Sequence, residues 1–152
     1  MKQSAGILLY RTTGGVTEVF LVHPGGPFFA KKDEGWWTVP KGELLPGELP
    51  LDGALREFEE EIGYKPEPPF LELEPVVQKA GKQVLCWAAQ GSLDAATIIC
   101  NTFEIEWPPK SGRRKQFPEV DKAGWYTLEQ AELLINDRQA AFLEQLRVIL
   151  KI

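Results

Sequence analysis

One helix constrains the fold of this chain more than any other segment. Residues Leu51–Ile62 carry Leu55, Phe58 and Ile62 at helical spacing, and Gly63 follows where a glycine commonly ends a helix. The spacing places these apolar side chains on one face, which must pack against another apolar surface. Strand-like segments lie before and after the helix, so a β-sheet is the expected packing partner.

The order of the other segments predicts the fold class. Apolar runs and alternating patterns indicate strands, and apolar residues at helical spacing indicate two more helices near the end. Strands are expected at Ser4–Tyr10, Thr17–His23, Trp36–Val39, Phe70–Lys79, Lys82–Gln90, Ile98–Trp107 and Gly124–Thr127, helices at Leu128–Ile135 and Asp137–Leu150, and loops at Pro40–Pro50 and Pro108–Lys115. This order favours an α/β (α+β) fold in which helices flank both faces of a mixed sheet. At 152 residues the chain is expected to form a single domain, 1–152.

Charge and composition exclude several classes of function. The net charge of −5 argues against binding to a nucleic-acid polymer, which requires a basic face. Cys86 and Cys100 have no metal-ligand spacing and do not make a disulfide framework. The chain has neither an apolar run long enough to span a bilayer nor the apolar core of a signal peptide. A cytoplasmic location without membrane contact is therefore expected, while the oligomeric state stays open.

Three glutamates on the first helix point to a metal site. Glu57, Glu60 and Glu61 lie at positions i, i+3 and i+4, so their side chains share one helix face. Each pair of like charges destabilises a solvated helix by about 0.2–0.5 kcal/mol, and burial increases this repulsion. A hard cation such as Mg²⁺, which takes carboxylate oxygens together with substrate phosphates, would remove the cost. Taken alone, the pattern also fits a solvated acidic face.

The residues around these glutamates resemble the Nudix box. Its glycines, glutamates and arginine are all present at the family's spacing, and Tyr64 replaces the usual aliphatic residue at the last position of the box. The matching residues are Gly42, Glu48, Arg56, Glu57, Phe58, Glu60, Glu61 and Gly63. This resemblance implies a Nudix-type αβα sandwich and a hydrolase that cuts a phosphoanhydride.

The resemblance also implies roles for individual box residues. Glu57, Glu60 and Glu61 would coordinate one to three Mg²⁺ or Mn²⁺ ions, and the backbone carbonyl of Lys41 would add a ligand. Glu48 and Arg56 are expected to be structural, because an Arg–carboxylate fork would hold the loop on the helix. Gly42 and Gly63 are expected where the backbone needs freedom or a side chain cannot fit.

A further glutamate is expected outside the box. Glu119 lies six residues before Trp125, a spacing that resembles diadenosine polyphosphate hydrolases of the family. It is the candidate for an additional metal ligand; Glu104 and Glu106 are rivals, and a solvated loop carboxylate is the other interpretation. Glu57 is the first candidate for the base that takes a proton from the attacking water, and Glu119 is the second.

Basic and aromatic residues are candidates for binding the rest of the substrate. The basic stretch with Lys110, Arg113, Arg114 and Lys115 could hold terminal phosphates, and Trp36 could stack a base. The alternatives are a solvated loop and a core tryptophan. Other candidates are Lys31, Lys32 and Lys41 for phosphates and Trp37, Phe28 and Phe29 for stacking, whereas the only histidine, His23, is expected to be structural or on the surface.

The resemblance leaves the substrate open. The expected partner is a small nucleotide, either a nucleoside triphosphate, as in MutT-type members, or a dinucleoside polyphosphate. The tyrosine or proline that marks some family substrates is missing, because Lys79, Ala80, Gly81 and Lys82 occupy those places. A Nudix-fold nucleotide sensor without catalysis is the alternative, and an acidic-helix interaction protein that binds no metal is a third interpretation.

Overall fold

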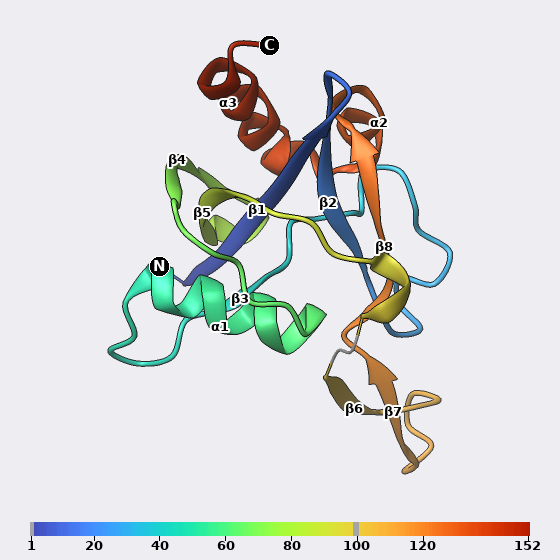
Figure 1. Cartoon of the computed structure of the whole chain (residues 1–152). Coiled ribbons are helices and arrows are strands. Elements are labelled where there is room, and N and C mark those ends of the chain that lie inside the picture. The colour runs from blue at the N-terminus through green and yellow to red at the C-terminus, as the bar shows by residue number, and fades with distance from the viewer. Residues whose placement is uncertain (1, 99–100) are drawn as a thin grey trace.

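The computed structural model describes residues 2–98 and 101–152, and its centre is a six-stranded mixed sheet (Figure 1). Strand order is β4-β5-β1-β2-β8, and β3 pairs with β1. The β1–β5 pair is parallel and the other pairs are antiparallel. The strands are β1 Gln3–Thr13, β2 Val16–Pro24, β3 Lys41–Glu43, β4 Leu71–Val77, β5 Gln83–Gln90 and β8 Val120–Thr127.

Helices cover both faces of this sheet. Helix α1 (Pro50–Ile62) lies on one face, and α2 (Leu128–Leu134) and α3 (Ala140–Leu150) lie on the other (Figure 1). Alternating residues of β1 therefore enter two different cores. Ile7 and Leu9 pack with α1, whereas Leu8 packs with α2 and α3. The predicted α+β sandwich with a mixed sheet is confirmed.

The buried side of α1 fixes the helix on the sheet. Phe58 is fully buried, Ile62 is nearly so, and Leu55 packs at the edge of the same cluster. Phe58 also contacts Phe20 of β2, with ring centroids 6.2 Å apart. Gly63 ends the helix with φ 77°, a left-handed conformation that glycine adopts without steric cost. This packing directs the glutamate face away from the apolar core under the helix.

The predicted loop Pro108–Lys115 ends earlier than expected: residues 108–113 form a turn, whereas Arg114 and Lys115 belong to a strand. Strands β6 (Thr102–Glu106) and β7 (Arg114–Pro118) form a separate hairpin that projects from the central sheet (Figure 1). Sequence alternation does not reveal β7, because four of its five side chains are exposed. Pairing with β6 defines the strand, in a register that places Phe117 opposite Phe103.

Smaller differences occur at the ends of elements. The expected loop Pro40–Pro50 contains β3, which is too short to show an alternating pattern. Asp137–Gln139 forms a 3-10 helix, so α3 begins at Ala140 instead of Asp137. Thr127 caps α2 through the expected capping box with Gln130. Of the predicted strand Ile98–Trp107, residues 99 and 100 lie outside the described residues, as does Cys100 among the two cysteines.

In the described part of the chain, the longest helix has 13 residues, and none is long and apolar enough to cross a membrane.

Candidate active site

Arg56 holds the loop before α1 against the helix. Its Nε and Nη2 donate to the two carboxylate oxygens of Glu48 at 2.8 and 3.0 Å, which is the fork geometry that matches a carboxylate. Nη2 also donates to the backbone carbonyl of Glu43 at 3.2 Å. The hydrogen bonds from Arg56 and from the Leu45 backbone lower the pKa of Glu48 to about 2. The loop is therefore held by an ionised carboxylate.

Gly42 lets strand β3 approach the glutamate face closely. A Cβ atom at this position would collide with the carboxyl group of Glu57. The middle of β3 and the middle of α1 therefore meet at the Glu57 carboxyl group. Only glycine allows this approach, because any other residue would displace Glu57.

Four carboxylates are brought together around this contact. Burial and the charges of its neighbours Glu57 and Glu119 raise the pKa of Glu61 to about 8. Burial is also the main cause that raises the pKa of Glu57 and the pKa of Glu119, and in both cases Glu60 contributes repulsion. These effects favour the protonated form of each carboxyl group. The structure thus places Glu119 beside the three box glutamates.

Lys41 lies against this carboxylate cluster. Its backbone N–H donates to the carboxylate of Glu61. Burial and the nearby charge of Lys82 lower the pKa of the Lys41 side chain, and Glu61 and Glu57 partly oppose this. Lys41 and Arg56 are the two cations next to the cluster. They do not balance the four glutamates and Glu48 when all five are ionised.

Backbone hydrogen bonds fix the position of Glu119. The Gly25 N–H donates to the Glu119 carbonyl at 2.9 Å, and the Glu119 N–H donates to the Asn101 carbonyl at 3.0 Å. The Asn101 N–H in turn donates to the carbonyl of Glu60 at 3.2 Å. This series connects the end of β2, the base of the β6–β7 hairpin and helix α1. Glu119 is therefore positioned by main-chain contacts, even though it lies far from the box in sequence.

The carboxylates open into a cavity of about 250 Å³ that we call the carboxylate pocket. Glu61, Glu119 and Lys41 line it, together with Trp36 and Asn136. Carboxylate oxygens beside a pocket are the donor set that Mg²⁺ or Mn²⁺ takes in proteins. The repulsion among the carboxylates gives such a cation a clear energetic reason to bind.

The present side-chain positions are not those of a closed metal centre. Nη1 of Arg56 donates to Glu57 at 2.9 Å and to Glu60 at 3.1 Å. Across residues 2–98 and 101–152, no three acidic, histidine or cysteine side chains converge as a ready metal cage. The residues fit a divalent cation by their chemistry, because Arg56 engages only one oxygen of Glu57 and one oxygen of Glu60, which leaves the other oxygen of each carboxylate for a cation.

The basic residues proposed for the substrate lie apart from this pocket. Lys110, Arg113 and Arg114 belong to the projecting β6–β7 hairpin and line neither the carboxylate pocket nor the larger cavity beside it. Arg114 pairs with Glu104 at 2.9 Å. Glu106 accepts the Lys110 N–H at 2.8 Å. The two rival glutamates are thus engaged within the hairpin.

The aromatic pair before the box is divided between two environments. Trp37 is buried and its indole N–H donates to Asp33 at 2.8 Å, whereas Trp36 is 41% exposed and lines the carboxylate pocket. Phe29 packs beside Trp36, with ring centroids 5.8 Å apart. Trp36 is therefore the member of the pair that can meet a ligand.

His23 is buried and structural in its contacts. Nδ1 lies 2.7 Å from a carboxylate oxygen of Asp121, and Nε2 lies 2.6 Å from the Lys32 carbonyl. The ring also packs on Trp37 with centroids 5.5 Å apart. His23 thereby ties the loop after β2 to strand β8.

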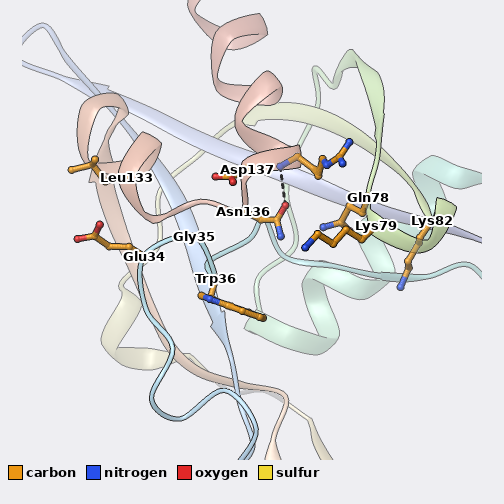
Figure 2. Close-up of a pocket in the computed structure, with 10 residues that line it drawn as sticks. Glu34, Gly35, Trp36, Gln78, Lys79, Lys82, Leu133, Asn136 and Asp137 are labelled. Carbon is orange, nitrogen blue, oxygen red and sulfur yellow. Dashed lines mark hydrogen bonds between the residues drawn. The ribbon is translucent and has the colours of Figure 1, made fainter.

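A second cavity, about 660 Å³ in volume, shares Trp36 and Asn136 with the carboxylate pocket, and sequence reasoning missed it. We call it the basic cleft. Figure 2 shows Lys79 reaching toward Asn136 and Trp36, with Glu34 and Leu133 at the opposite end. The only signal in the sequence was that Lys79 and Lys82 occupy the places of the missing substrate markers. The lining residues are Glu34, Gly35, Trp36, Gln78, Lys79, Lys82, Leu133, Asn136, Asp137 and Arg138.

Comparison with known proteins identifies the family. The NUDIX domain model matches residues 1–146, and the chain therefore belongs to the Nudix family. The rat bis(5'-nucleosyl)-tetraphosphatase [asymmetrical] is 40% identical over 60 residues, covering 36% of this chain and 41% of that protein. A nucleoside triphosphate pyrophosphatase/Nudix hydrolase fusion protein of Bifidobacterium longum is 39% identical over 67 residues, covering 42% of this chain and 13% of that protein. The chain thus spans less than half the length of both relatives.

Solved structures share the whole fold. An Ap4A hydrolase of C. elegans in a binary complex has a TM-score of 0.69 and 24% identity, covering 97% of this chain and 98% of that chain. The NUDIX domain of Shewanella oneidensis NrtR, complexed with ADP ribose, has a TM-score of 0.65 and 20% identity. The match covers 97% of this chain and 87% of that chain. At these identities the likeness concerns the fold.

Proposed function

We propose that this protein is a Nudix pyrophosphohydrolase that hydrolyses a phosphoanhydride in a nucleoside diphosphate-linked substrate. The observation that carries the proposal is the proximity of Glu119 to the three box glutamates, together with the place of Glu61 and Glu119 in the lining of the carboxylate pocket. A nucleoside triphosphate or a dinucleoside polyphosphate is the substrate class. The names of the rat and C. elegans proteins support the dinucleoside polyphosphate, since each is named as a hydrolase of such a compound.

Mg²⁺ or Mn²⁺, held by Glu57, Glu60, Glu61, Glu119 and the Lys41 carbonyl, would neutralise the charge of the anhydride oxygens and make water a better nucleophile. The carboxylates supply the negative charge that retains the cation. Lys41 lines the same pocket, and a charged ammonium group there would attract a phosphate oxygen.

Glu57 is the first candidate for the general base and Glu119 the second. Burial raises the pKa of each, which makes each carboxylate a stronger proton acceptor than an exposed glutamate. The hydrogen bond from Arg56 counteracts this effect at Glu57, so Glu57 becomes the better base when it leaves Arg56. The two candidates are distinguished by replacing each with glutamine and recording which variant loses the acidic limb of the pH–rate profile.

Trp36 would stack the base of the nucleotide. Its indole is partly exposed and forms a wall common to the carboxylate pocket and the basic cleft. Aromatic stacking contributes about 0.5–1.5 kcal/mol beyond the burial of area. The hairpin cations Lys110, Arg113 and Arg114 remain candidates for contacts with a substrate that extends beyond these cavities.

The test is a phosphate-release assay with magnesium over dinucleoside polyphosphates, nucleoside triphosphates and ADP-ribose. Native protein should hydrolyse at least one of them, and chelation of the metal should abolish the reaction. Glu60→Gln should lose about two or more orders of magnitude in kcat/KM, because a metal ligand is removed. Glu59→Gln is the matched control: Glu59 is the neighbouring glutamate on α1, and its side chain is exposed. Equal activity of Glu60→Gln and native protein would contradict the proposal.

A catalytically inactive Nudix-fold nucleotide sensor is the second candidate. The pairing of Arg56 with both Glu57 and Glu60 favours it, because Arg56 occupies one oxygen of each of these two candidate metal ligands. A sensor would bind nucleotide with the same affinity with and without magnesium and would turn over none of the compounds in the screen.

A further inference from the structure

The basic cleft carries cations that the carboxylate pocket does not use. Lys79, Lys82 and Arg138 line it, and Glu34 and Asp137 are the acidic residues of the lining. Lys79 lies between β4 and β5, and Arg138 lies in the 3-10 helix before α3. In the ranges that the structure describes, no carboxylate lies within 4.0 Å of the Lys79 ammonium or the Arg138 guanidinium group. Both side chains are exposed to the solvent that a ligand would replace.

The cations continue from this cleft to the carboxylate pocket. Lys82 lines the basic cleft and Lys41 lines the carboxylate pocket, and the two cavities share Trp36 and Asn136. Two like charges held near one another are stabilised by an anion. Lys82 has one described ion pair, with the exposed Glu43 at 3.6 Å, a length at which solvent screening leaves little attraction. A multiply charged anion could therefore extend from Lys41 past Lys82 toward Lys79.

Hydrogen-bond donors from two amide side chains complete the lining of the basic cleft. The Asn136 Oδ1 atom accepts the Arg138 backbone N–H at 2.9 Å, so the amide NH₂ of Asn136 is what this side chain can offer to a ligand (Figure 2). Gln78 provides a second amide from the other side of the cleft (Figure 2). Ammonium, guanidinium and amide donors together suit phosphate oxygens.

We propose that the basic cleft binds a phosphate group of the substrate that lies beyond the anhydride cut at the carboxylate pocket. The ligand class is an extended polyphosphate chain, either that of a nucleoside polyphosphate or the bridging chain of a dinucleoside polyphosphate, with one of its charged phosphate groups in the basic cleft. An uncharged sugar or base in the same place would leave Lys79 and Arg138 without a counter-charge. The direction of the chain rests on the proposed function, whereas the binding of phosphate by the cleft does not.

Calorimetric titration in metal-free buffer at low salt tests the proposal without turnover. The probes are inorganic tripolyphosphate, adenosine 5'-tetraphosphate and ADP-ribose, whose distal end is an uncharged sugar. We expect native protein to bind the first two more tightly than the third. Lys79→Gln combined with Arg138→Gln should weaken binding of tripolyphosphate and of the tetraphosphate about tenfold or more, since each lost contact is charge-assisted. Binding of ADP-ribose should change less than twofold.

Lys65→Gln is the matched control, because Lys65 is an exposed lysine that lines neither cavity. It should bind all three probes like native protein. No binding of tripolyphosphate by native protein, or an equal change for all three probes in the double variant, would overturn the proposal. Glu60→Gln should bind tripolyphosphate at least as well as native protein. If native protein hydrolyses no anhydride and still binds tripolyphosphate through Lys79 and Arg138, the proposed function fails and the anion site stands.

Discussion

Replacing Glu61 with glutamine should change how stability depends on pH in the metal-free protein. Burial together with Glu57 and Glu119 raises the pKa of Glu61 to about 8, whereas a glutamate in an unfolded chain titrates near 4.5. Between these values the native state holds a proton that the unfolded chain has released. The free energy of unfolding must therefore decrease as pH rises through this window.

The size of this decrease follows from the two pKa values. One pKa unit corresponds to about 1.4 kcal/mol, and the linkage relation gives a loss of about 3 kcal/mol between pH 5.5 and pH 8 as an upper bound. Glu57 and Glu119 add changes of the same sign, because their pKa values are also raised. Glutamine is uncharged at every pH and still accepts the Lys41 N–H, so Glu61→Gln removes the largest of these contributions.

Urea unfolding in the presence of EDTA, at pH 5.5 and at pH 8, measures the effect. Native protein should lose stability between the two conditions, Glu61→Gln should lose clearly less, and the variant should be the more stable protein at pH 8. Glu59→Gln, a substitution of the exposed neighbour on α1, should follow native protein. The reasoning is refuted if Glu61→Gln and native protein show the same change of stability with pH.

Three further substitutions test the packing that holds the site. Gly42→Ala should lower kcat/KM at least tenfold in the phosphate-release assay, because the added Cβ displaces the Glu57 carboxyl group; a fully active variant would contradict the close approach. Arg56→Lys should lower the free energy of unfolding by about 1–3 kcal/mol, because a lysine cannot form the two parallel hydrogen bonds that Arg56 donates to Glu48. An unchanged melting temperature would argue against the role of Arg56 in holding the loop on the helix. Phe58→Ala should cost about 3–5 kcal/mol in urea unfolding, since a fully buried ring is removed, and a loss below 1 kcal/mol would be inconsistent with its burial.

The parts of the fold that sequence predicts are those with a strong local pattern. The buried face of α1 and the apolar runs of β1 and β2 are visible in short windows, and their positions in the structure agree to within a few residues. Strand β7 has no such pattern, because its residues are mostly exposed. Its conformation depends on the register with β6, which is a contact between segments and not a property of either one.

The candidate site also contains residues that a local sequence pattern predicts and residues that only contacts between segments bring into place. Glu57, Glu60 and Glu61 share a helix face by their spacing alone, whereas the position of Glu119 depends on backbone bonds from Gly25 and to Asn101. The basic cleft is less predictable still. Lys79 and Arg138 come from turns at the ends of different elements, and only the completed sheet brings them to one cavity.

The two faces of α1 act against each other in the free energy of folding. Burial of Phe58 stabilises the helix on the sheet, and the same docking holds Glu57 and Glu61 in a place where burial disfavours their charge. The helix cannot move to relieve this repulsion, because Arg56 and Glu48 fix its loop and Gly42 lies against Glu57. A cation that binds only the native state would recover the lost stability, by about 2.7 kcal/mol at a concentration one hundred times its Kd. The melting temperature at pH 8 should therefore rise with magnesium in native protein and rise less in Glu61→Gln. An equal rise in both would show that the cation binds somewhere other than these carboxylates.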